Sequence, residues 1–184
     1  MGALPQPVIV SFEEFLAGIN DKDLYARCEY WDGEIIEKAM PAEQHADVQI
    51  QLGSELVMYF RANPIGRAYT ELHCVFLPGR RALVPDLSVV LGARQPGGEA
   101  LQRAPDLAVE ILSPDDRASR VARKIEQYVT GGVKIVWVID PEIRRAWVYK
   151  PNEPVRAVGI DGKLTGDDLL PGLEIALANL FPAS

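Results

Sequence analysis

Hydrophobic and polar positions follow two different periods along this chain, and each change of period marks a change in predicted secondary structure. Over 42–61, apolar residues recur three and four positions apart, which predicts a long amphipathic helix with His45 in its first turn. The segment 115–130 has the same period and predicts a second major helix. A capping box of the form S-x-x-E predicts a third, shorter helix over 12–18.

Strand signals occupy most of the remaining chain. Asp32-Gly33 lies between two β-rich segments and favours a hairpin turn, because glycine accepts a positive φ. One later segment is apolar except for Lys134, which is typical of a strand buried on both faces. The predicted strands are 25–31, 34–38, 68–77, 84–91, 106–112, 133–139 and 145–150, followed by an element of undefined type over 169–181. This order predicts an α/β fold with a mixed β-sheet core flanked by helices.

Composition adds limits to this picture. The chain has 184 residues, is 48% hydrophobic and 24% charged, and has no repeat or long linker, which predicts a single domain over 1–184. No apolar run approaches the roughly 18 residues that a membrane-spanning helix needs. The N-terminal segment has no basic region followed by an apolar one, so we expect no secretory signal. Cys28 and Cys74 form no metal-type cluster, and we expect a reduced, cytoplasmic setting.

The formal net charge of -7 argues mildly against indiscriminate binding to nucleic acid, because phosphate binding needs local cations. Local clusters could supply them or could be solvated surface. The clusters are Arg80-Arg81, Arg144-Arg145, and Arg117, Arg120 and Arg123 with Lys124.

Two acids interrupt otherwise apolar predicted strands, Asp86 within 84–91 and Glu110 within 106–112. Carboxylates in such places are costly unless they are paired, hydrogen-bonded or bound to a metal. Their hard oxygen donors suit Mg²⁺ or Mn²⁺. The alternative is a pair of capping or salt-bridging acids near strand ends.

Lys124 is the third candidate. It falls within the buried stripe of its predicted helix, three residues after Val121 and four before Tyr128. An inward-facing ammonium needs an anionic partner, and the two acids are the obvious ones. A lysine there could position the attacking water or stabilise charge on a phosphate. It could also extend to solvent at the edge of the stripe.

These residues, in this order, resemble the PD-(D/E)XK nuclease superfamily, and more closely its Uma-type (Uma-two) family of restriction endonucleases. The similar stretches run nearly end to end and form a specific ordered set, although pieces such as Pro85-Asp86 are weak alone. They are Glu29-Tyr-Trp-Asp-Gly33-Glu34, His45, Val84-Pro-Asp-Leu-Ser-Val-Val90, Ala108-Val-Glu-Ile-Leu-Ser-Pro114, Lys124-x-x-x-Tyr128, Gly132-Val133, Trp137-Val-Ile-Asp-Pro141 and Leu170-Pro-Gly-Leu173.

The resemblance implies a restriction-endonuclease-like core in which Asp86 and Glu110 bind Mg²⁺, with the Ile111 carbonyl as a further ligand. The superfamily's lysine stands two residues after the glutamate, where this chain has Leu112. The family takes this lysine from the next helix, and Lys124 matches that place. An acid often precedes that lysine by four residues, where this chain has an arginine, at position 120.

The resemblance also gives His45 an auxiliary role at the rim of the site. Glu34 could supply another acid to the site or be an exposed hairpin acid, and the exposed position is favoured. Glu29 stands similarly. Tyr128 could hydrogen-bond within the pocket or pack, with packing favoured, and His73 is interpreted as a structural residue.

We therefore expect a Mg²⁺- or Mn²⁺-dependent endonuclease acting on DNA, assembled as a homodimer or larger oligomer because duplex cleavage generally needs two sites. Two alternatives stay open. One is a catalytically inactive member that serves as a nucleic-acid or protein interaction module, and the other is hydrolysis of a different phosphoester.

Overall fold

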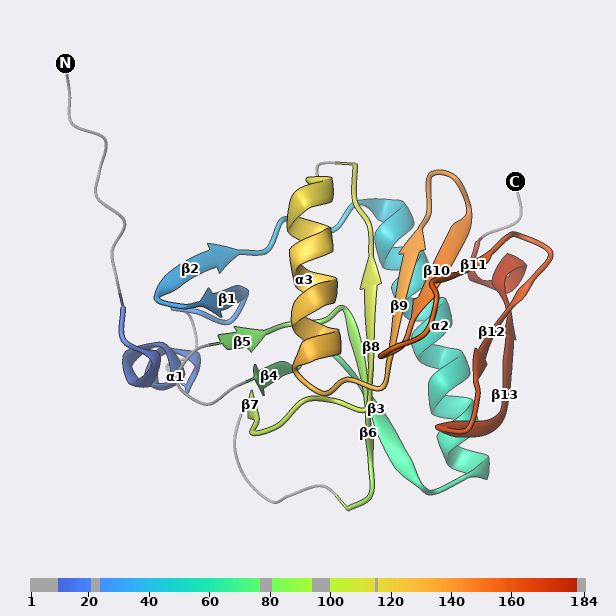
Figure 1. The fold of residues 1–184 in the computed structure, drawn as a ribbon, viewed down its shortest axis with the longest axis horizontal. Coiled ribbons are helices and arrows are strands. Elements are labelled where there is room, and N and C mark those ends of the chain that lie inside the picture. Colours follow the sequence, from blue (N-terminus) through green and yellow to red (C-terminus); the bar gives the residue numbers. More distant parts are fainter. Residues whose placement is uncertain (1–9, 21–23, 77–80, 94–99, 115, 182–184) are drawn as a thin grey trace.

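A six-stranded mixed sheet lies at the centre of the computed structural model, which describes residues 10–20, 24–76, 81–93, 100–114 and 116–181 (Figure 1). Its strand order is β11-β10-β9-β8-β6-β3, with β8 and β9 parallel and the other neighbours antiparallel. These strands are β3 (Gly66–Thr70), β6 (Leu87–Leu91), β8 (Leu107–Ile111), β9 (Ile135–Asp140), β10 (Arg145–Tyr149) and β11 (Arg156–Val158).

A second sheet of five short strands, in the order β2-β1-β5-β4-β7, lies beside the first on the side of α1 (Phe12–Asn20) (Figure 1). Its strands are β1 (Cys28–Trp31), β2 (Glu34–Glu37), β4 (His73–Phe76), β5 (Arg81–Leu83) and β7 (Ala100–Leu101). Phe15 of α1 is fully buried and packs in one hydrophobic cluster with Tyr30 and Val75 of this sheet. The burial of these apolar side chains joins α1 to the second sheet.

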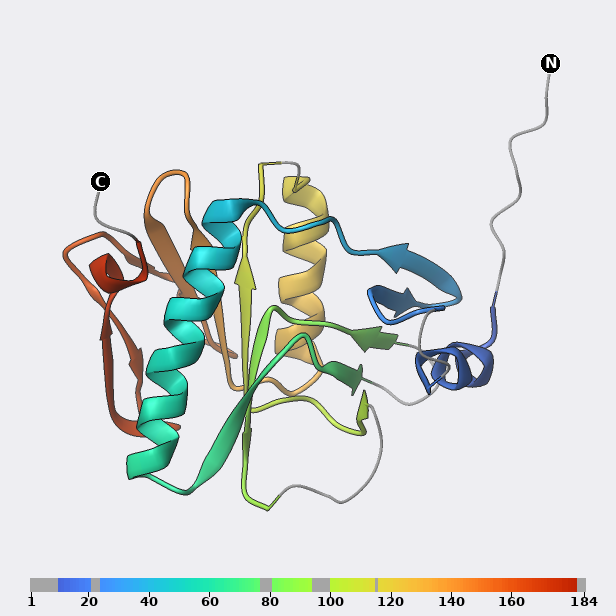
Figure 2. The same cartoon turned by 180° about the vertical axis from the view of Figure 1, so that it is seen from behind.

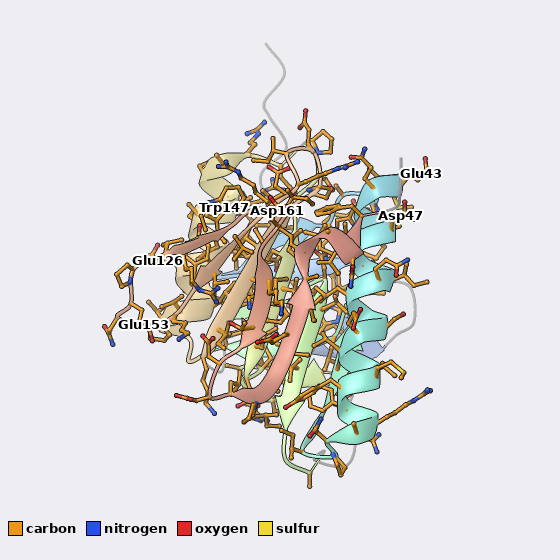
Figure 3. The ribbon with its side chains drawn as sticks, turned by 90° about the vertical axis from the view of Figure 1, so that its right-hand side faces the viewer. Glu43, Asp47, Glu126, Trp147, Glu153 and Asp161 are labelled. Atoms are coloured by element: carbon orange, nitrogen blue, oxygen red, sulfur yellow. The ribbon has the colours of Figure 1, made fainter. Side chains whose placement is uncertain are left out.

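Helices cover the two faces of the six-stranded sheet, as Figures 2 and 3 show: α2 (Glu43–Ala62) lies on one face and α3 (Ala118–Thr130) on the other. On the α2 side, Leu52 and Leu56 pack with Val109 of β8. The same cluster includes the C-terminal hairpin and the 3-10 helix that follows it, which are β12 (Lys163–Gly166), β13 (Leu170–Ala176) and η1 (Leu177–Leu180).

Alternation along β8 assigns its side chains to the two faces. Val109 and Ile111 belong to the cluster under α2, whereas Ala108 packs in the cluster that contains Tyr128 of α3. Glu110 therefore faces α3 and the second sheet.

The predicted α/β class and the mixed sheet flanked by helices are confirmed, and the three predicted helices are present. The single strand predicted over 68–77 is wrong: β3 and β4 belong to different sheets, because the chain turns between them at Glu71, whose φ is 48°. Asp86 was expected inside a strand but lies just before β6, and Lys134 lies just before β9. The strands β5, β7, β11 and β12 were not predicted.

Arg80 and Asp115, which belong to a predicted cationic cluster and a predicted helix, lie outside the described residues. Among the described residues, none of the helices combines the length and the hydrophobicity that crossing a bilayer requires.

Candidate active site

The segment Val84-Pro85-Asp86 carries the chain from the second sheet to the central one and fixes Asp86 between them. The Asp86 amide donates to the Val109 carbonyl at 3.0 Å. The Asp86 carbonyl accepts hydrogen bonds from Gln49 Nε2 at 2.9 Å and from the Glu71 amide at 3.2 Å. With its backbone held on three sides, Asp86 is only 3% exposed.

The Asp86 carboxylate has a different partner on each oxygen. Lys38 Nζ lies 2.8 Å from Oδ1, whereas Oδ2 accepts from the Ile111 amide at 2.7 Å and lies 3.2 Å from His45 Nε2. Burial raises the pKa of this carboxyl, but the His45 hydrogen bond and the charge of Lys38 outweigh it and hold the pKa well below its usual range. Asp86 is therefore a carboxylate at neutral pH.

Glu110 projects from β8 toward α3, where two side chains one helical turn apart meet it. Lys124 Nζ lies 2.8 Å from Oε2, and the Tyr128 hydroxyl donates a short hydrogen bond to Oε1. Burial raises the pKa of Glu110 to about 7, although the charge of Lys124 acts in the opposite direction. Tyr128, interpreted from the sequence as a packing residue, packs edge-on against Phe76 and also serves this carboxylate.

Lys124 is buried between two acids. Its Nζ lies 2.8 Å from Glu29 Oε1 as well as 2.8 Å from Glu110 Oε2, and 3.4 Å from the Val84 carbonyl oxygen. Burial lowers the pKa of Lys124, but the charges of Glu110 and Glu29 outweigh it and raise the pKa above its usual range. Lys124 is thus an ammonium held at the junction of both sheets and α3.

Glu29 belongs to the site, which was one of the two roles considered for it, and its favoured interpretation as an exposed hairpin acid is wrong. It is 3% exposed, accepts from the Val84 amide at 2.9 Å and accepts from Trp31 Nε1 at 3.2 Å. A signal was present, because Glu29 stands among Cys28, Tyr30 and Trp31 as a lone acid in an apolar run. Glu34, on the neighbouring strand, is exposed as expected.

Lys38 is a site residue that sequence reasoning missed. It follows β2 and reaches Asp86 and the Val84 carbonyl, 48 and 46 residues further along the chain. The local sequence around it has no pattern that indicates burial, so this contact could not be found by periodicity.

Four of the predicted residues therefore meet at one place, namely Asp86, Glu110, Lys124 and His45. Ile111 also lies there, and its amide contacts Asp86. His73, by contrast, does not line this pocket, and its Nε2 pairs with the Cys28 carbonyl at 3.1 Å. Cys28 and Cys74 are both free thiols.

The charged cluster lines a pocket of about 110 Å³ to which Arg120 also contributes. A larger pocket of about 550 Å³ adjoins it and shares His45, Leu112 and Asp116. The small pocket can hold an ion and a few waters, and the larger one offers room for part of a substrate beside it.

Hard carboxylate oxygens are the donors that Mg²⁺ takes, commonly one or two from protein with water and phosphate completing the shell. Asp86 and Glu110 fit that pattern. Within the described ranges, no group of three or more His, Cys, Asp or Glu residues could hold a metal ion. Any Mg²⁺ would therefore depend on these two carboxylates together with main-chain carbonyl oxygens and non-protein ligands.

The mixed sheet, its flanking helices and the acids and lysine at their junction define a restriction-endonuclease-like α/β protein. The chain belongs to the Uma2 family, described as "Putative restriction endonuclease", whose model matches residues 12–178. It is similar to the crystal structure of a putative nuclease of DUF820 from Anabaena variabilis ATCC 29413, with a TM-score of 0.80 and 28% sequence identity. That match covers 94% of this chain and 97% of the Anabaena chain. Comparison with curated proteins finds no match.

Proposed function

We propose that this protein is a Mg²⁺-dependent endonuclease that hydrolyses phosphodiester bonds of DNA. The observation that carries the proposal is the position of Lys124, which reaches Glu110 Oε2 at 2.8 Å from the helix after β8, while the usual lysine position is Leu112. A variant PD-(D/E)XK site with its lysine supplied by the following helix accounts for this geometry. The Uma2 family description and the nuclease description of the Anabaena protein support the same reaction class.

In this proposal Asp86 and Glu110 bind the ion, with the Ile111 carbonyl as a further ligand. Bound Mg²⁺ would polarise the phosphodiester and lower the pKa of the attacking water. Lys124 orients that water and stabilises the charge that develops on the phosphate. The water oxygen forms the new bond to phosphorus as the bond to the leaving sugar oxygen breaks, and the proton passes to that oxygen through solvent. His45 acts as an auxiliary group by holding Asp86 Oδ2, from which it lies 3.2 Å.

The same proposal includes a homodimer or larger assembly, because two strands of a duplex require two cuts, and a cytoplasmic setting, which the two free cysteines support. The oligomer rests on analogy with other nuclease cores.

A second candidate is a catalytically inactive module that binds nucleic acid or protein. It is favoured by the partners of the site acids: both oxygens of Asp86 and both oxygens of Glu110 already accept from protein donors. The acidic pI of about 4.9 also favours it.

Plasmid nicking measured over a titration with Mg²⁺ or Mn²⁺ distinguishes the endonuclease from the inactive binding module. We expect metal-dependent nicking by the wild type and a loss of about 10²-fold or more in Asp86→Ala and Lys124→Ala. Lys134→Ala is the matched control, since that lysine pairs with Asp106 away from the pocket. Equal activity in all four proteins removes the assignment, and salt-sensitive DNA binding without metal-dependent cleavage supports the module instead.

A further inference from the structure

Two ammonium groups converge on one main-chain carbonyl oxygen, that of Val84, beside the pocket. Lys38 Nζ lies 3.0 Å and Lys124 Nζ 3.4 Å from the Val84 oxygen. Lys38 also contacts Asp86 Oδ1 and Lys124 contacts Glu110 Oε2, each at 2.8 Å. The reaction proposed above gives a role to Lys124 and none to Lys38.

The remaining partners of the two acids show which oxygens an ion can take. Asp86 Oδ2 accepts from the Ile111 amide, which is main chain of a central strand and cannot move away independently. Glu110 Oε1 accepts from the buried Tyr128 hydroxyl. The two oxygens whose contacts are with lysine are Asp86 Oδ1 and Glu110 Oε2. An ion held by both acids would therefore take the place of an ammonium at one or both of these oxygens.

The two lysines differ in what they keep once an ion binds. Lys124 retains Glu29, 2.8 Å from its Nζ, and it is anchored on α3. Lys38 lies outside any helix or strand, and within the described part of the chain its ion pair is with Asp86 alone. Its side chain is 16% exposed, compared with 10% for Lys124. Lys38 is thus the ammonium that can leave.

The charges of the site indicate which anion the released Lys38 ammonium would bind. Glu29, Asp86 and Glu110 with the two lysines sum to one negative charge, so a bound divalent ion would make this group of five side chains and the ion positive by one. The other charged side chains that line the pocket are Glu37, Glu71, Asp116 and Arg120, so the positive charge is local to the ion and the two lysines. A free, flexible ammonium beside such a pocket is suited to a phosphate oxygen, for which lysine acts as a mobile point charge. Lys38 lines the pocket into which that phosphate would come.

We propose that Lys38 is a second functional lysine of this site. It holds Asp86 Oδ1 in the metal-free protein, yields that oxygen to the divalent ion, and then binds a phosphate oxygen of the nucleic-acid strand. This inference rests on the proposed function, in which Asp86 binds metal and the substrate is a phosphodiester.

Two binding measurements test it without requiring cleavage. Isothermal titration with Mn²⁺ alone is expected to give about tenfold tighter binding in Lys38→Met than in wild type, because the competing ammonium is gone. Binding of a DNA duplex in Ca²⁺ is expected to weaken about tenfold in the same variant. Lys38→Arg is expected to restore DNA binding, because arginine keeps the charge. Lys134→Met, a change to a lysine whose side chain is 61% exposed, is expected to match wild type in both assays.

Weaker Mn²⁺ binding in Lys38→Met overturns the proposal, because Lys38 would then merely support Asp86. Unchanged DNA affinity in Lys38→Met also overturns it. Equal Mn²⁺ affinity of wild type and Asp86→Asn would contradict both this inference and the proposed nuclease function, because both require Asp86 to bind the ion. If Mn²⁺ and DNA binding change as expected but the protein does not nick DNA, only the proposed nuclease activity is contradicted, and the role of Lys38 in binding stands.

Discussion

Glu29 acts on the site through another side chain. It lies 2.8 Å from Lys124 Nζ and is itself fixed by the Val84 amide and the Trp31 indole. Glu29→Gln should leave Lys124 with one charged partner, Glu110, and lower metal-dependent nicking about 10–100-fold, the usual effect of removing a supporting partner. Glu34→Gln, on the paired strand and exposed, should nick at the wild-type rate. Equal rates for the two variants would contradict this role.

Tyr128 contributes to stability through its hydroxyl as well as its ring. The hydroxyl donates to the buried Glu110 carboxylate, and the ring meets Phe76 edge-on with centroids 5.6 Å apart. Tyr128→Phe keeps the ring contact and leaves the carboxylate one donor short, so we expect a loss of about 1.5–3 kcal/mol in unfolding free energy by urea denaturation. Tyr59→Phe, at an exposed hydroxyl, should change it by less than about 0.5 kcal/mol. Similar losses of unfolding free energy in both variants would contradict a specific role for the hydrogen bond to Glu110, because removing any tyrosine hydroxyl would then have the same effect.

Asp106 ties three strands of the central sheet together where β8 begins. Its amide donates to the Val89 carbonyl at 2.8 Å, and its carboxylate accepts from the Leu91 amide at 2.8 Å and from Lys134 Nζ at 3.0 Å. Burial raises the pKa of Asp106, but the Leu91 hydrogen bond and the contact with Lys134 lower it overall. A lowered folded-state pKa stabilises the protein above the unfolded value, and that stabilisation is lost as the pH falls through the folded value.

We therefore expect Asp106→Ala to cost about 1–2 kcal/mol at pH 7. The difference from wild type should close as the pH falls below about 4, near the unfolded pKa of aspartate. Urea denaturation at several pH values measures it, with Asp161→Ala as the control at an exposed acid (Figure 3). A difference that stays constant down to pH 2 would contradict the electrostatic origin.

The elements also show how far sequence reasoning extends. The helices were predictable because a helix records its buried face in local spacing. Asp86 and Glu110 were predictable because each is a lone acid in an apolar run, and Lys124 because it falls within the buried stripe of its helix. The separation of β3 from β4 depends on one residue at positive φ, which no periodicity signals.

The burial of Glu29 arises from long-range pairing. Strand β1 pairs with β5 through Tyr30 and Ala82, and this pairing carries the hairpin acid into the junction of the sheets. The contact between Lys38 and Asp86 depends on the same pairing, because Lys38 follows β2, the strand that pairs with β1. Sequence patterns locate residues within an element, but they do not determine which distant elements meet.

At the scale of the whole molecule, the site joins both sheets and α3, so an ion that binds there should stabilise the entire chain. Linkage gives about 2.7 kcal/mol at a Mg²⁺ concentration of 100 times Kd, and for a chain of this size that corresponds to a rise in Tm of about 5–10 °C. Asp86→Asn should abolish the rise. Its own Tm without Mg²⁺ is expected to be lower, because Lys38 loses the anion 2.8 Å away, so the shift and not the absolute Tm is the quantity to compare. Glu126→Gln, at an exposed acid on α3, should keep the full shift (Figure 3). An equal rise in Asp86→Asn would place the ion elsewhere on the protein, because only binding that depends on Asp86 can couple this pocket to the stability of both sheets.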